Sequence, residues 1–159
     1  MCLVAACVVV ACAQDGKAGQ RPDLLDEPTV LLAGSEDVKS SDDYNGAISY
    51  AIAAEYPASD VIERLDQNLR AKGFVPLNEE VIFNATPTSY RSWTLVEADG
   101  VESWVWNGEW RGQDGTVYGV LLRFAGRSAS GGPRPNGKLS VGVIAYSQST
   151  IDAIKAAMK

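Results

Sequence analysis

Apolar and polar residues alternate in several short segments after residue 44, and a period of two predicts β-strands. The first such segment places Ile48, Tyr50 and Ile52 on one side and small or polar residues on the other. Similar segments predict strands at residues 90–97, 101–110, 117–125 and 139–146. The turn signal Asp99-Gly100 separates the second strand from the third. Consecutive strands joined by short turns imply an antiparallel sheet.

The segment after the first strand instead repeats its apolar residues with the period of a helix. Its apolar stripe consists of Ala58, Val61, Ile62, Leu65 and Leu69. Pro57 is tolerated in a first helical turn, and Asp60 with Glu63 has the spacing of a capping pair. Gly73 supplies the left-handed conformation that commonly ends a helix. The sequence therefore predicts an amphipathic helix between Pro57 and Gly73.

A second, shorter helix is predicted at the end of the chain. Ser149 is expected to cap it, and Ile151, Ile154 and Met158 share one of its faces. The predicted order of elements is β-α-β-β-β-β-α. We therefore expect an α+β fold, in which a single antiparallel sheet has two helices packed on one face.

Residues 1–43 do not follow these patterns and divide into two parts. Residues 1–12 contain no charged side chain and hold all three cysteines of the chain. Residues 13–43 are rich in Gly, Pro, Asp, Ser and Lys, which predicts a flexible tether. Within the tether, the apolar residues 29–32 either add to the domain, as an edge strand or a cover for the core, or form a sticky patch in a mobile tail. One folded α+β domain is expected over residues 44–159.

The segment Val9-Val10-Ala11-Cys12 resembles the lipobox of bacterial lipoproteins, in which two aliphatic residues and a small one precede the cysteine that receives the lipid. The apolar run before it is much shorter than the roughly 20 residues that span a bilayer, and it suits a signal peptide. The resemblance implies that Cys12 carries acyl chains, such as palmitate, that anchor the protein in a membrane. Ala13, in place of aspartate, points to the outer membrane where the source has one.

Two alternatives to the lipid anchor remain open from the sequence. Ala11-Cys12-Ala13 also fits an ordinary signal-peptidase site, which would release a free periplasmic or secreted protein. In addition, no cationic segment precedes the apolar run, so a start upstream of Met1 is the other alternative.

Composition narrows the chemistry of the predicted domain. The chain has no histidine, and no cysteine follows Cys12. This excludes Ser-His-Asp and Cys-His nucleophiles and the usual zinc sites. The sequence also contains no glycine-rich phosphate-binding motif. We therefore predict no catalytic residue, metal or cofactor, and the net charge of −6 argues against nucleic acid as a partner.

A row of tryptophans is the most distinctive feature of the predicted sheet. Side chains at even spacing share a face of a strand, so Trp104, Trp106 and Trp110 line up. The other face is more polar and reads Ser103, Val105, Asn107 and Glu109. We therefore expect Trp104 and Trp106 under the helices, with a ligand or partner surface as the alternative. Trp110 follows a predicted bulge at Asn107-Gly108 and is expected to be the most exposed of the row.

Acidic pairs occur at Asp42-Asp43 and Glu79-Glu80. Such pairs coordinate calcium or support carboxylate hydrolysis when they converge on one site. Adjacent residues of a strand point to opposite sides, however, and loop acids are mostly solvated, so we expect both pairs at the surface. The basic segment 126–137 is expected to be a hairpin connection.

Several landmarks between Tyr50 and Phe124 resemble small bacterial secreted proteins and lipoproteins of unassigned function. These landmarks are Tyr56-Pro57-Ala58, Leu69…Lys72-Gly73-Phe74, Asn84-x-x-Pro87-Thr88-Ser89, Trp93 and Trp106-x-x-x-Trp110. The resemblance implies a location in the cell envelope and brings no activity or catalytic residue.

These observations predict a lipid-anchored protein of the bacterial envelope whose domain is a non-catalytic binding or accessory module. Its expected partners are the membrane, through Cys12, and an envelope protein or glycan. One alternative is a histidine-free hydrolase that acts on cell-wall or surface polymer through two carboxylates. Another is a structural subunit of an envelope assembly.

Overall fold

The computed structural model describes residues 24, 29–41, 47–53, 57–81, 89–125 and 138–157. Within these residues the chain forms seven strands and two helices, which are β1 (Glu36–Ser41), β2 (Ala47–Ile52), α1 (Ala58–Ala71), β3 (Val75–Pro76), β4 (Thr94–Ala98), β5 (Val101–Arg111), β6 (Val117–Ala125), β7 (Leu139–Tyr146) and α2 (Gln148–Ala157). The strands make one antiparallel sheet in the order β1-β2-β7-β6-β5-β3, and β4 also pairs with β5. This confirms the predicted α+β fold and its antiparallel sheet.

The register of the sheet follows the predicted turns. Ala98 pairs with Val101, so Asp99 and Gly100 alone close the β4–β5 hairpin. Both have positive φ angles, 53° and 75°, as the tight turn between twisted strands requires. β5 then pairs with β6 without interruption from Ser103 to Arg111. The predicted bulge at Asn107-Gly108 is therefore wrong, because the strand passes through it in regular register.

The first helix forms as its apolar stripe predicts. The residues of α1 that are buried are Ala58, Val61, Leu65 and Leu69. Pro57 directly precedes the helix, and no side-chain hydrogen bond caps its start, so the predicted Asp60–Glu63 capping pair is wrong. Gly73 has a φ of 84° just past the end of the helix, and its N–H donates to Arg70 O. The predicted glycine stop is therefore confirmed.

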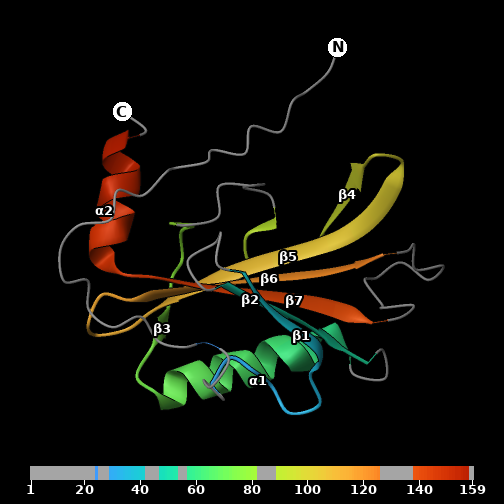
Figure 1. Cartoon of the computed structure of the whole chain (residues 1–159), viewed down its shortest axis with the longest axis horizontal. Coiled ribbons are helices and arrows are strands. Elements are labelled where there is room, and N and C mark those ends of the chain that lie inside the picture. The colour runs from blue at the N-terminus through green and yellow to red at the C-terminus, as the bar shows by residue number, and fades with distance from the viewer. Residues whose placement is uncertain are drawn as a thin grey trace.

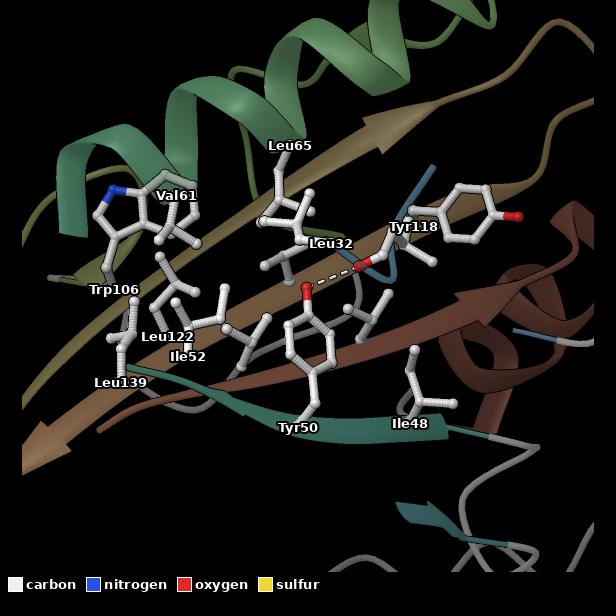
Figure 2. Close-up of a cluster of buried hydrophobic side chains, with 14 of the residues drawn as sticks. Leu32, Ile48, Tyr50, Ile52, Val61, Leu65, Trp106, Tyr118, Leu122 and Leu139 are labelled. Carbon is white, nitrogen blue, oxygen red and sulfur yellow. Dashed lines mark hydrogen bonds between the residues drawn. The ribbon is translucent and has the colours of Figure 1, made fainter. Parts of the chain in front are cut away.

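The main core lies between α1 and the face of the sheet that carries the tryptophans (Figures 1 and 2). α1 contributes Val61 and Leu65 from above in the close-up, and the strands contribute apolar side chains from below. The strand residues of this core are Ile48, Tyr50, Ile52, Trp106, Trp110, Tyr118, Val120, Leu122, Phe124, Leu139, Val141 and Val143. All of them belong to the same alternating set in their strands, so one face of the sheet supplies the whole cluster.

The segment before residue 44 belongs to this core, which corrects the predicted boundary of the tether. Leu24, Val30 and Leu32 are buried in the same cluster. The Tyr50 hydroxyl donates a buried hydrogen bond of 2.6 Å to Val30 O, drawn as a dashed line in Figure 2. β1 then pairs with β2 at the edge of the sheet. The folded part therefore begins upstream of Tyr44, because an apolar run that can fill a core gap does not stay in water.

The two helices do not share a face of the sheet, in contrast to the prediction. Figure 1 shows α1 on one side of the sheet and α2 on the other. The tryptophan face is already covered by α1 together with Leu24, Val30 and Leu32. α2 follows β7 after Ser147 alone, and it buries Ile151 outside that core cluster. Thr150 N–H donates to Ser147 Oγ, so Ser147, and not the predicted Ser149, caps α2.

Neither α1 nor α2, the helices in the described part of the chain, has the length and apolar character needed to cross a bilayer. Several sequence predictions fall on residues outside the described ranges. These are the lipobox and Cys12, the acidic pair Asp42-Asp43, the basic segment 126–137, and Met158.

Gly108 is explained by the packing of its neighbour on the same face. The Trp106 side chain lies across the strand, so that a Cβ at position 108 would be 2.5 Å from Trp106 Cη2. Trp106 is buried and cannot move aside freely. A glycine at position 108 thus allows the indole to lie flat on β5.

We expect Gly108→Ala to lower the free energy of unfolding by about 1–3 kcal/mol, because the added methyl group displaces a buried indole. Urea unfolding monitored by tryptophan fluorescence measures this change. Gly142→Ala in β7 is the matched control, since its Cβ would lie 3.9 Å from Leu121 Cβ, an ordinary contact. Equal effects of the two substitutions would contradict this explanation.

Candidate functional site

The structure places the tryptophan row at the core, which decides between its two interpretations. Trp104, Trp106 and Trp110 share a face, as predicted, and that face is covered by α1. Trp106 is buried and Trp104 is half-buried against the core. Trp110 is 0% exposed, so the prediction that it is the most exposed of the row is wrong. Trp106 and Trp110 therefore do not form a surface for a ligand or partner.

Trp110 is buried because α1 supplies an acceptor for its polar atom. Its indole Nε1–H donates to Asp66 Oδ1 over 2.7 Å, and Arg70 donates to the other carboxylate oxygen over 2.6 Å. Partial burial raises the pKa of Asp66, but the hydrogen bonds from Trp110 and Arg70 and the positive charges of Arg70 and Arg91 outweigh it and lower the pKa below its usual value. The carboxylate thus links α1 to β5 through a hydrogen bond to the buried indole.

The opposite face of β5 carries polar residues that are as deeply buried as the core. Asn107 is 1% exposed and Glu109 is 0% exposed. They are covered by residues 77–81, after β3, and residues 89–91, before β4, whose contacts are given below. We call Glu80, Tyr90, Arg91, Asn107 and Glu109 the β5 polar cluster.

Carboxylates and an amide hold the first covering segment on the sheet. Val81 N–H donates to Glu109 Oε2 over 2.6 Å. Asn107 Nδ2 donates to Glu80 Oε1 over 2.8 Å. The main chain also takes part, since Leu77 N–H donates to Glu109 O over 2.9 Å. The connection therefore donates to β5 through its main-chain N–H groups, and β5 donates to the connection through the Asn107 side chain.

Arg91 closes the gap between β3 and β4 along the outer side of β5. Its guanidinium donates to Leu77 O and to Glu109 O, and its main-chain N–H donates to Asn107 O. The guanidinium carbon also lies 4.9 Å from the centre of a Trp110 ring. Its φ of 52° is in the left-handed region, which costs a non-glycine residue about 1–3 kcal/mol. These contacts offset that strain.

The cluster shifts the protonation of its members. Partial burial and then the charge of Glu109 raise the pKa of Glu80 from its ordinary 4.5 to about 7, and the hydrogen bond from Asn107 opposes this. Burial and the charge of Glu109 also raise the pKa of Tyr90, with Arg91 acting in the opposite direction. Glu80 can therefore gain or lose a proton near neutral pH.

Two carboxyl groups, one with a pKa near 7, are the elements of general acid–base chemistry. The geometry limits what they can do here. Glu109 has no exposed surface and binds the main chain of the covering segment, so it cannot touch a substrate in this conformation. Among the described residues, no group of three or more acidic or cysteine side chains is placed to hold a metal ion. The cluster thus uses its charges to fix the connection on the sheet.

The predicted surface position of the Glu79-Glu80 pair is confirmed for the exposed Glu79 but not for Glu80, which is half-buried and accepts a hydrogen bond from Asn107. The available signal was Glu109 beside Asn107 in a long strand, since a strand of this length carries few polar residues without a partner. That signal could not identify Glu80, because Glu80 is 27 positions away in the chain from Asn107, its hydrogen-bond partner.

Comparison with protein-family models, curated proteins and solved structures finds no significant match. The resemblance to small bacterial secreted proteins and lipoproteins therefore stays a prediction.

We expect the β5 polar cluster to make stability depend on pH. Because the pKa of Glu80 is higher in the folded than in the unfolded chain, the folded state binds that proton more tightly. Its contribution to the free energy of unfolding falls as the pH rises from 4.5 to about 7 and is constant above that range. Solvent screening reduces the fall to about 1 kcal/mol.

Glu80→Gln keeps the acceptor for Asn107 and removes the titration. Denaturant unfolding at pH 5, 6, 7 and 8 measures the free energy of unfolding of both chains. The value for this variant should increase relative to that of the wild type as the pH rises. Glu79→Gln, at the exposed neighbour, should leave the wild-type profile in place. If the free energy of unfolding of Glu80→Gln decreases with pH as much as that of the wild type, another group causes the pH dependence.

Proposed function

We propose that this protein is a lipid-anchored component of the bacterial envelope and that its domain is a non-catalytic binding or accessory module. The lipobox at residues 9–12 supports the anchor. The observation that carries the second part is the burial of Glu109, whose carboxylate holds the chain's own Val81 N–H. The carboxylate best suited to catalysis thus stabilises the fold. Binding of a partner would therefore use residues at the surface.

A second candidate function is hydrolysis of cell-wall or surface polymer through the Glu80–Glu109 pair. The observation in its favour is the pKa of about 7 at Glu80, next to a second carboxylate. It requires the covering segment to leave Glu109 so that both acids face a substrate. Displacing the segment would break the hydrogen bonds that Val81 and Leu77 donate to Glu109. The non-catalytic module is therefore the better-supported proposal.

The anchor is tested by replacing the cysteine. In a bacterial host we expect the wild-type chain in the membrane fraction and Cys12→Ser in the soluble envelope fraction, because the acyl chains supply the membrane affinity. Mass spectrometry of the amino-terminal peptide should find the added acyl mass only in the wild type. Cys7→Ser, within the apolar run, is the control and should remain membrane-bound. Retention of Cys12→Ser in the membrane would overturn the anchor.

One incubation experiment distinguishes a binding module from a hydrolase. We expect the mature chain to bind peptidoglycan fragments, surface glycans or envelope extracts with a shift in the emission of the half-buried Trp93 and Trp104, and to release no reducing ends. Release that disappears in Glu80→Gln would support the hydrolase instead. An emission spectrum that none of these additions changes would remove the support for binding.

A further inference from the structure

The two edges of the sheet differ in structure. On one side, β1 is an irregular strand: its register with β2 shifts between Glu36 and Lys39, and Asp37 has a φ of 53°. Lys138 lies beside it and bridges Glu36 and Asp37 at 2.7 and 3.1 Å. Bulges and charged side chains of this kind prevent the addition of another strand.

β4, on the other side, has no bulge, and its single charged side chain is Glu97. The strand pairs with β5 in regular register from Thr94 to Ala98, and no described strand pairs with its other side. Figure 1 shows the β4–β5 hairpin projecting at the end of the sheet, on the side away from α1. Leu95 on β4 is 39% exposed and Val101 on β5 is 50% exposed. The hairpin thus offers a regular strand edge flanked by exposed apolar side chains.

The charge of the hairpin points to the chemistry of a partner. Residues 97–102 contain Glu97, Asp99 and Glu102 and no lysine or arginine. Glu97 lies directly across from Glu102 on β5, and its own side chain is exposed. A basic side chain of a partner placed next to Glu97 would pair with its carboxylate.

We propose that β4 binds an extended segment of a partner protein as an additional strand, with an apolar residue beside Leu95 and a lysine or arginine beside Glu97. This inference rests on the proposed function and names its partner class. Leu95 and Glu97 are two residues apart and share a face, so the partner segment carries its apolar and basic residues in the same spacing. Val96 and Ala98 face the other way and favour small apolar residues between them.

A second copy of the chain fits less well, because β4 contains no basic residue to set beside Glu97 and each copy carries a net charge of −6.

The test uses synthetic peptides with the cores Lys-Val-Leu-Val-Lys and Glu-Val-Leu-Val-Glu, which present the required spacing in either strand orientation. We expect the mature full chain to bind the lysine peptide, and binding should slow amide hydrogen exchange in residues 95–98. Glu97→Lys should weaken this binding about three- to tenfold and should let the glutamate peptide bind. Glu63→Lys, at an exposed site on α1, makes the same change in net charge and should leave the affinity within about twofold.

Each remaining outcome counts against the inference. An equal loss in Glu63→Lys would mean non-specific attraction, and unchanged exchange at β4 would place the peptide elsewhere. Self-association through β4 in sedimentation experiments would make a second copy the occupant. Binding of envelope components with β4 amides unaffected would overturn this inference and leave the proposed function in place.

Discussion

From Trp106 to Trp110, β5 is buried on both of its faces, and the rest of the fold is arranged around this segment. One face needs only apolar cover, which α1 and the segment near Val30 provide. The other face contains a carboxylate at Glu109, and a buried charge is costly unless hydrogen bonds replace its water. The connection between β3 and β4 supplies such bonds from its own main chain. Glu109 therefore holds Val81 of that connection against the strand.

The need for hydrogen-bond partners at the buried polar groups of β5 also explains why two short strands share its outer side. β3 and β4 pair with its two ends, and Leu77 and Arg91 satisfy the main-chain groups between them. A single long strand in that place would have to pass through the positions that Glu80 and Arg91 occupy. The interruption lets charged side chains reach the middle of the sheet while every neighbouring carbonyl keeps a donor.

Alternation in the sequence identified which residues share a face, and the turn at Asp99-Gly100 identified which strands are neighbours. Both depend on residues close together in the chain, which is why β6 and β7 were predicted without error. What covers each face depends on distant segments. Trp110 needs Asp66 from α1, and Glu109 needs Val81, and neither pairing leaves a local pattern. The candidate site was missed for that reason.

The packing of Leu24 in the core also limits how far the domain can stand from a surface. A tether over residues 13–43 would span about 100 Å when fully stretched. Leu24 is already packed in the domain, so only residues 13–23 separate it from Cys12, a stretch that covers at most about 40 Å. A lipid at Cys12 would thus confine the sheet to a shell only a few nanometres deep above the lipid headgroups.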